Sequence, residues 1–140
     1  MTKIMIVDDS LRARCALKAL ISQQEGITVT AEASNGQEAI QNISEQRPDI
    51  VIMDIRMPVM DGLEAIRAIK AGWSQVKIII LTMYPEHQAE AMAAGADAFL
   101  VKGCPLGDIT DLIQSFQGWR PVYSLFIRNC QMISIPPQIL

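Results

Sequence analysis

The sequence predicts an α/β fold in which a five-stranded parallel sheet carries helices on both faces. Short apolar runs alternate with segments of helical periodicity up to about residue 117 of the 140-residue chain. Most of these runs are apolar at every position, which is typical of parallel strands buried on both faces. Strands that alternate with helices in this way form one parallel sheet joined by right-handed crossovers.

Five apolar runs predict the strands. They cover residues 4–7, 27–33, 50–53, 76–81 and 98–101. The run at 27–33 differs from the others, because its apolar residues alternate with Thr28, Thr30 and Glu32. Alternation with a period of two is typical of a strand with one face less covered, so we expect this strand at an edge of the sheet.

Five segments predict helices, and each has a recognisable start or stop. Ser10 and Asn35 are suitable N-cap residues, and proline opens the segments at 85 and 105. Glycine ends three of the segments, at Gly72, Gly95 and Gly118. The predicted helices cover residues 11 to about 24, 36–46, 62–71, 85–94 and 105–117.

Composition places the chain among ordinary globular domains. Half of the residues are hydrophobic and 19% are charged, and the formal net charge is −3. The acidic balance disfavours a nucleic-acid-binding face. The three cysteines are widely spaced and form no CxxC pair, which favours a reducing, cytoplasmic location over a disulfide framework or zinc site. No apolar run is long enough to span a membrane, and the N-terminus lacks a signal-peptide layout.

We therefore expect a domain over residues 1–117 and a distinct tail over 118–140. The tail contains Arg120 and Arg128, no acidic residue, and three prolines. It is also rich in large apolar side chains. Its sequence predicts no regular element, and it would either pack back on the domain, mediate association or remain an extension.

Polar side chains follow four of the predicted strands where each strand ends. They are Asp8, Asp9, Asp54, Thr82 and Lys102. Ligands bind beyond the carboxyl ends of the strands in open parallel sheets. The sequence therefore predicts that three carboxylates, one hydroxyl and one ammonium group meet at one edge of the sheet.

Three carboxylates at one place repel one another unless a cation lies between them. Mg2+ suits such a site because it prefers oxygen ligands, and the absence of His and Cys from the set disfavours zinc or copper. Lys102 and Thr82 supply a charge and a hydroxyl for phosphate oxygens. Together these groups can place a phosphoryl group on an aspartate.

These motifs resemble the receiver domain of bacterial two-component response regulators. The resemblance rests on the segments 7–10, 53–62, 81–82 and 98–102, in the family's order and spacing. Residues 81–84 and 95–103 look most like the NarL/FixJ-type subfamily. The resemblance implies a flavodoxin-like, doubly wound sheet with strand order 2-1-3-4-5.

The resemblance also implies roles for individual residues. Asp54 would accept the phosphoryl group from a sensor histidine kinase's phosphohistidine. Asp9 would bind Mg2+ directly, Asp8 would assist through water, and the backbone carbonyl of Arg56 would complete the protein ligands. Lys102 would contact the phosphoryl group.

Two further positions would pass the change on. Thr82 would move towards the phosphoryl group, and Phe99 would turn inward after it. Phe99 stands where relatives more often carry tyrosine, and Arg56 and Tyr84 occupy two positions that tune hydrolysis of the acyl phosphate in the family. The result would be a changed partner or homodimer surface near the fourth helix, the fifth strand and the fifth helix. The chain would then be the receiver part of a transcriptional regulator, without direct nucleic-acid or membrane binding of its own.

Two alternatives remain open at this stage. A phosphohydrolase with an aspartate nucleophile usually has a second acid two residues on, but Arg56 occupies that place after Asp54. A phosphorylation-independent interaction module would instead act through the last helix and the tail. Asp61, Gly62 and His87 have sufficient structural explanations, as an N-cap, a turn and a surface side chain.

Overall fold

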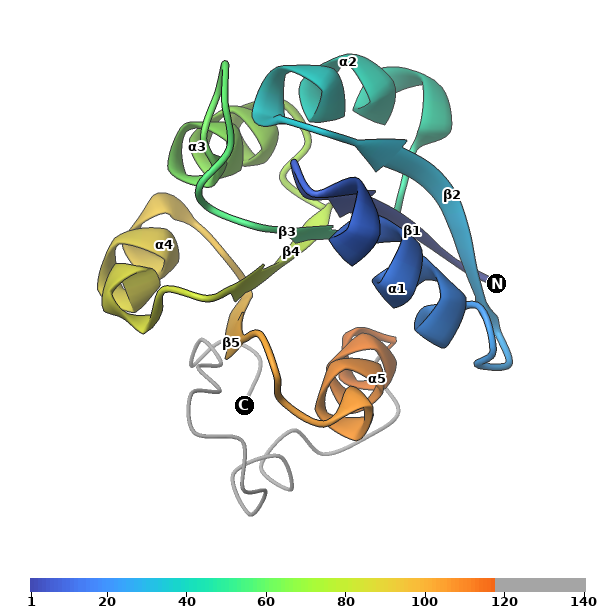
Figure 1. Cartoon of the computed structure of the whole chain (residues 1–140). Helices are drawn as coiled ribbons and strands as arrows, with labels where there is room; N and C mark the ends of the chain where they lie inside the picture. The colour runs from blue at the N-terminus through green and yellow to red at the C-terminus, as the bar shows by residue number, and fades with distance from the viewer. Residues whose placement is uncertain (118–140) are drawn as a thin grey trace.

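The computed structural model describes residues 1–117, which form alternating strands and helices (Figure 1). The strands are β1 (Thr2–Val7), β2 (Ile27–Ala33), β3 (Ile50–Met53), β4 (Lys77–Thr82) and β5 (Ala98–Val101). The helices are α1 (Leu11–Ile21), α2 (Gly36–Gln46), α3 (Gly62–Gly72), α4 (Gln88–Ala94) and α5 (Leu106–Phe116), and a 3-10 turn η1 (Pro85–His87) precedes α4.

The five strands form one parallel sheet in the order β2-β1-β3-β4-β5, as predicted. The alternating strand β2 lies at the edge, and the register of its pairing with β1 shifts between Ile4 and Met5. The order reverses next to β1, so the carboxyl ends of β1 and β3 flank the switch point at which α/β sheets bind ligands.

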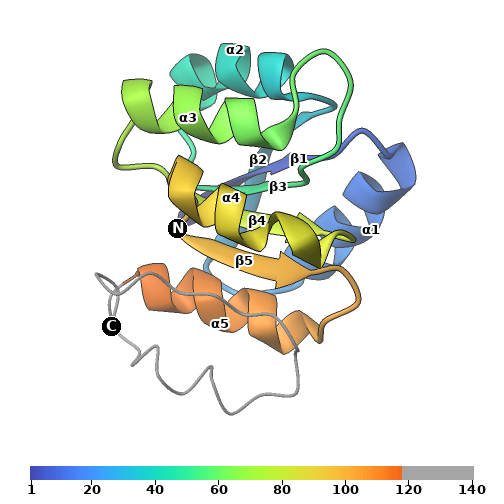
Figure 2. The same ribbon diagram turned by 90° about the vertical axis from the view of Figure 1, so that its left-hand side faces the viewer.

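Helices cover both faces of the sheet. α2, α3 and α4 lie on one face, and α1 and α5 lie on the other (Figures 1 and 2). Successive strand residues serve opposite cores: Met5 packs with the first group of helices and Ile6 with the second. Each large apolar side chain buried in this way contributes about 1.5–3 kcal/mol.

The predicted helix starts at Leu11, Gly36 and Gly62 agree with the structure. The side chains of Ser10, Asn35 and Asp61 accept hydrogen bonds from the backbone N–H three residues on, at the starts of α1, α2 and α3. The other boundaries differ: α3 includes Gly72, which was predicted to follow it, and α5 covers Leu106–Phe116, one residue shorter at each end than predicted. α1 ends at Ile21, before the predicted limit of about residue 24, with Ser22 as its C-cap, and the chain then turns through Gly26, which has φ +80°, to enter β2. The helix predicted from Pro85 begins as the 3-10 turn η1.

A buried carboxylate joins α3, β4 and the start of β5. Asp97 is 6% exposed, and its Oδ2 lies 2.6 Å from Lys70 Nζ and accepts a hydrogen bond from the Ile78 N–H at 2.8 Å. Lys70 also donates to the Val76 carbonyl oxygen at 2.7 Å. Polar contacts therefore stabilise the sheet at the amino ends of β4 and β5, in addition to the hydrophobic core.

None of the helices within residues 1–117 is both long and apolar enough to cross a membrane. The tail predicted over residues 118–140 lies outside the described residues, so its division from the domain stays a prediction.

Candidate functional site

The polar strand ends meet at the carboxyl edge of the sheet. Lys102 Nζ lies 2.7 Å from Asp8 Oδ2 and 2.9 Å from Asp54 Oδ2. One carboxylate oxygen from each of Asp8, Asp9 and Asp54 lies within 4.8 Å of the other two. The structure thus brings together the acidic and basic side chains that the sequence placed at separate strand ends.

The chain holds these carboxylates in fixed directions. Asp8 Oδ1 accepts a hydrogen bond from the Ser10 N–H at 2.9 Å, and Asp54 Oδ1 accepts one from the Ile55 N–H at 2.7 Å. Asp8 and Asp54 are 6% and 7% exposed, whereas Asp9 is exposed. Each buried carboxylate therefore keeps one oxygen on the backbone and turns the other to Lys102.

Lys102 balances part of the negative charge. Burial by itself lowers the pKa of Lys102, but hydrogen bonds to Asp8 and Asp54 outweigh burial, so this pKa lies above its usual range. The ammonium group stays charged at neutral pH. Three carboxylates and one ammonium leave the cluster with net negative charge, which favours a further cation.

Thr82 and Phe99 are both buried, in the neighbouring strands β4 and β5. Thr82 is 0% exposed at the end of β4, and its carbonyl oxygen accepts a hydrogen bond from the Lys102 N–H at 2.8 Å. The Thr82 hydroxyl oxygen accepts one from the Tyr84 N–H at 3.3 Å. Phe99 is also 0% exposed and packs in the core under α3 and α4. In this state the aromatic ring already points inward.

The loop after β3 is tightly constrained at its end. The Gly62 N–H donates to the Ile55 carbonyl oxygen at 2.7 Å, and a Cβ on Gly62 would lie 2.4 Å from the Asp54 carbonyl oxygen. Only glycine fits such an approach. By contrast, within residues 1–117 no hydrogen bond ends at the Arg56 carbonyl oxygen.

Val59 is the strained residue of this loop. It has φ +68°, a left-handed conformation that is costly for a branched side chain, and it is 82% exposed. We expect Val59→Asn to raise the free energy of unfolding by about 0.5–1 kcal/mol, because asparagine tolerates this conformation. Urea denaturation measures the change. Val59→Thr keeps the branched Cβ and should give no gain, and equal gains from both variants would contradict the strain argument.

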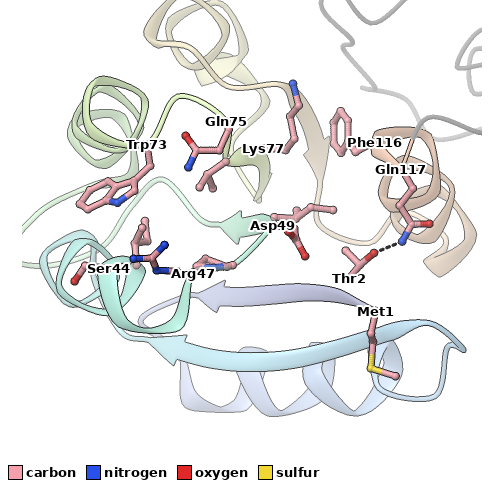
Figure 3. A pocket seen from close by; sticks show the side chains of 14 residues that line it. Met1, Thr2, Ser44, Arg47, Asp49, Trp73, Gln75, Lys77, Phe116 and Gln117 are labelled. Atoms are coloured by element: carbon pink, nitrogen blue, oxygen red, sulfur yellow. Dashed lines mark hydrogen bonds between the residues drawn. The ribbon is translucent and has the colours of Figure 1, made fainter.

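A pocket lies at the end of the sheet opposite to the carboxylate cluster. It has a volume of about 700 Å3 and is bordered by the starts of β1, β3 and β4 and by the end of α5. Figure 3 shows Trp73 and Arg47 on one side of it and Gln117 next to Thr2, whose hydroxyl accepts a hydrogen bond from the Gln117 amide. None of the clustered acidic residues lines this pocket, so it is separate from the candidate site.

The carboxylate cluster, its lysine and the sheet order all point to the family that the motifs resemble. A family model described as the response regulator receiver domain matches residues 4–114, most of the chain. The chain belongs to this family.

Sequence relatives of the receiver domain include whole response regulators. The chain is 34% identical over 133 residues to the response regulator protein VraR of Staphylococcus epidermidis, covering 91% of this chain and 64% of VraR. It is 35% identical over 123 residues to VraR of Staphylococcus aureus, covering 86% of this chain and 59% of VraR. The receiver domain described here therefore spans less than two thirds of these relatives.

Solved structures give the same family and fold. A two-component response regulator of the LuxR family from Aurantimonas has a TM-score of 0.79 and 33% identity, and the match covers 86% of this chain and 89% of that one. The response regulator domain of Thermotoga maritima CheB has a TM-score of 0.73 and 25% identity, with 91% of this chain and 98% of that one covered. The LuxR-family relatives agree with the NarL/FixJ-type resemblance.

Sequence reasoning missed some contacts that shape the receiver site. It assigned no role to the Ser10 N–H that orients Asp8, and it did not pair Arg56 with Tyr84. His87, expected to be a plain surface side chain, is half-buried and packs its ring against Tyr84. Such contacts join separate loops and leave no periodic pattern in the sequence.

Proposed function

We propose that this receiver domain accepts a phosphoryl group on Asp54 from the phosphohistidine of a sensor histidine kinase, with Mg2+ bound beside it. The observation that carries the proposal is the placement of Lys102 Nζ 2.9 Å from Asp54 and 2.7 Å from Asp8, within a cluster of three carboxylates. A buried carboxylate with its own lysine and a cation site has the parts that phosphoryl transfer to aspartate requires.

The residues present fit Mg2+. The donors are oxygens only: the carboxylates of Asp8, Asp9 and Asp54, and the carbonyl oxygen of Arg56, which no described residue uses. Asp9 and Asp54 would bind the ion, with Asp8 acting through water. The bound ion would supply positive charge next to the phosphoryl oxygens and relieve repulsion among the carboxylates.

The chain's own residues would carry the transfer. An oxygen of Asp54 attacks the phosphorus, the bond between phosphorus and the histidine nitrogen breaks, and the imidazole leaves with the electron pair. Lys102, freed from part of its pairing with Asp54, would hold a phosphoryl oxygen by a charge-assisted hydrogen bond. The Thr82 hydroxyl would donate to another oxygen. Lys102, Thr82 and Asp54 are thus the three residues proposed to act on the phosphoryl group.

The wider role follows from the relatives. One similar structure, 25% identical with a TM-score of 0.77, is a CheX–CheY complex from Borrelia burgdorferi with BeF3− and Mg2+. Others are LuxR-family response regulators. We propose that the domain acts in the cytoplasm as the receiver part of a transcriptional regulator, and that phosphorylation changes a partner or homodimer surface around α4, β5 and α5, including Phe99 beneath it.

Intact-protein mass spectrometry tests the proposal directly. Incubation with Mg2+ and acetyl phosphate should add one phosphoryl group to the wild-type protein. Asp54→Asn should remove this gain, while Asp61→Asn, a change at the N-cap of α3, should keep it. If the wild-type mass stays unchanged, or if Asp54→Asn still gains the group, the assignment of Asp54 is wrong. If partner binding or self-association is unchanged by Asp54→Ala and by Mg2+, the phosphorylation-independent interaction module is favoured instead.

Asp9 offers a test of the charge argument. Because Asp9→Asn removes one of three crowded negative charges, we expect the variant to melt at a higher temperature than the wild type in chelator. Added Mg2+ should then raise the melting temperature of the wild type and have a much smaller effect on the variant. Equal or lower melting of the variant in chelator would refute the crowding argument. Asp49→Asn, at the other end of the sheet, is the matched control for the Mg2+ effect.

A further inference from the structure

The loops that follow β3 and β4 are joined by Arg56 and Tyr84. Arg56 lies two residues after Asp54, and Tyr84 lies two residues after Thr82. The guanidinium carbon of Arg56 lies 3.6 Å from the centroid of the Tyr84 ring, which is cation–π geometry. Because β3 and β4 are neighbours in the sheet, this stack bridges the loop beside the phosphoacceptor and the segment that leads into α4.

Tyr84 is in turn connected to its surroundings. Its N–H donates to the Thr82 hydroxyl oxygen at 3.3 Å, and its ring meets the His87 ring edge-on, with centroids 6.3 Å apart and planes at 74°. Arg56 Nη2 also lies 3.7 Å from Glu86 Oε1, but these two side chains are 57% and 59% exposed, so that ion pair is weak. Among the described residues, Arg56 therefore links the two loops by its stack on Tyr84 and by a weak ion pair with Glu86.

Arg56 contributes to both sides of this link. Its side chain contacts Tyr84, while its carbonyl oxygen accepts no hydrogen bond from residues 1–117 and is a ligand in the proposed Mg2+ site. Phe99, by contrast, is 0% exposed and already points inward. The inward rotation expected of this residue therefore cannot start from the conformation seen here. A connection from the metal site to α4 therefore has a physical route through Arg56 and Tyr84.

We propose that the Arg56–Tyr84 stack couples cation binding at the carboxylate cluster to the conformation of η1 and α4, with Tyr84 as a positioning residue. The inference rests on the proposed function, because it uses the Arg56 carbonyl as a ligand. An ion that restrains the Arg56 backbone also restrains its guanidinium group, which restrains the Tyr84 ring and the turn that follows it. By thermodynamic linkage, a fixed Tyr84 strengthens ion binding by the same factor.

Isothermal titration of the metal-free full chain with Mg2+ measures one direction of the coupling. Tyr84→Ala should weaken Mg2+ binding about two- to fivefold, the strength of an exposed cation–π contact. Tyr84→Phe keeps the ring and should bind like the wild type. Met83→Ala changes an exposed neighbour in the same loop and should also bind like the wild type. Equal affinities for the alanine and phenylalanine variants at position 84 would overturn the proposal.

Hydrogen exchange measures the reverse direction. Mg2+ should slow amide exchange in residues 84–94 of the wild type, and Arg56→Ala should remove this effect although alanine keeps the backbone carbonyl. Arg67→Ala, an exposed arginine on α3, should retain it. If the wild type binds Mg2+ without protecting these amides, the coupling is wrong and the proposed function stands. If the wild type does not bind Mg2+ at all, the metal site and the coupling both fail.

Discussion

Gly62→Ala should destabilise the domain by about 3 kcal/mol, at the upper end for an overpacked core site. The added Cβ would lie 2.4 Å from the Asp54 carbonyl oxygen and 2.8 Å from the Ile55 Cα. Both are backbone atoms, so no side chain can swing away to make room. Relief requires the start of α3 to move, which breaks the 2.7 Å hydrogen bond from the Gly62 N–H to the Ile55 carbonyl oxygen.

The same change should reduce phosphorylation at Asp54, the proposed phosphoacceptor, under conditions in which the variant is folded, because the added Cβ meets the Asp54 carbonyl oxygen. Urea denaturation measures the loss of stability, and intact mass measures the phosphoryl gain. Gly72→Ala is the matched control at the other end of α3, where an added Cβ meets nothing within 4 Å. It should be neutral or slightly stabilising, by up to about 1 kcal/mol. Similar losses at both positions would mean that the close contact at Gly62 is unimportant.

Lys102→Met should lower the free energy of unfolding by about 3 kcal/mol at neutral pH and abolish the gain of the phosphoryl group. The variant keeps the length of the side chain but leaves Asp8 and Asp54, which are 6% and 7% exposed, without their shared cation. Removal of one partner from a buried pair is costly because the remaining charge stays in a place of low polarity. Asp54→Asn in the same chain should restore part of the loss, since one of the two carboxylates is then neutral.

Alkaline pH supplies an independent test of Lys102. Its pKa in the folded protein lies above the ordinary value of 10.5, so its contribution to stability is complete below that pH and is lost as the pH rises through the folded pKa. Urea denaturation of the wild type should therefore show that the free energy of unfolding declines as the pH rises above 10.5, and Lys102→Met should lack that part of the decline. Lys3→Met, an exposed lysine on β1, is the control. Parallel declines for the wild type and Lys102→Met would show that the paired ammonium does not stabilise the fold.

Most of the architecture was predictable because it depends on periodic burial. The runs at 27–33, 50–53 and 98–101 coincide with β2, β3 and β5, and the edge position of β2 follows from its alternation. The starts of α1, α2 and α3 were predictable because each side-chain cap acts within three residues of sequence, whereas α4 and α5 have no such cap. Element boundaries that depend on a tertiary contact were not predicted. Thr82, for example, belongs to β4 because its carbonyl oxygen accepts a hydrogen bond from the Lys102 N–H of the neighbouring chain segment.

The candidate site was predictable to the level of its members. Parallel strands end at one edge, so Asp8, Asp54 and Lys102 were expected to meet there if their strands were neighbours, in the order that the family resemblance implied. The ion pairs within the site were not predicted. The sequence indicated repulsion among the carboxylates, and the structure adds that Lys102 lies between the two buried ones, Asp8 and Asp54, and reduces that repulsion. The strain at Val59 and the stack of Arg56 on Tyr84 arise from loop geometry, for which the sequence carries no repeating pattern.

The buried Asp97–Lys70 pair has a mechanical consequence for α4. The C-terminal end of this seven-residue helix leads within a few residues into Asp97, which is paired with Lys70 of α3 and bonded to the Ile78 N–H of β4. Its N-terminal end begins in the 3-10 turn η1, where the His87 N–H donates to the Tyr84 carbonyl oxygen and the His87 ring packs edge-on against the Tyr84 ring. A helix that is fixed at its C-terminal end and less restrained at its N-terminal end can rotate about the fixed end. We therefore expect displacement in this domain to be largest at Tyr84–His87 and to fade towards Asp97, so that a small shift beside the strand ends is converted into a tilt of α4.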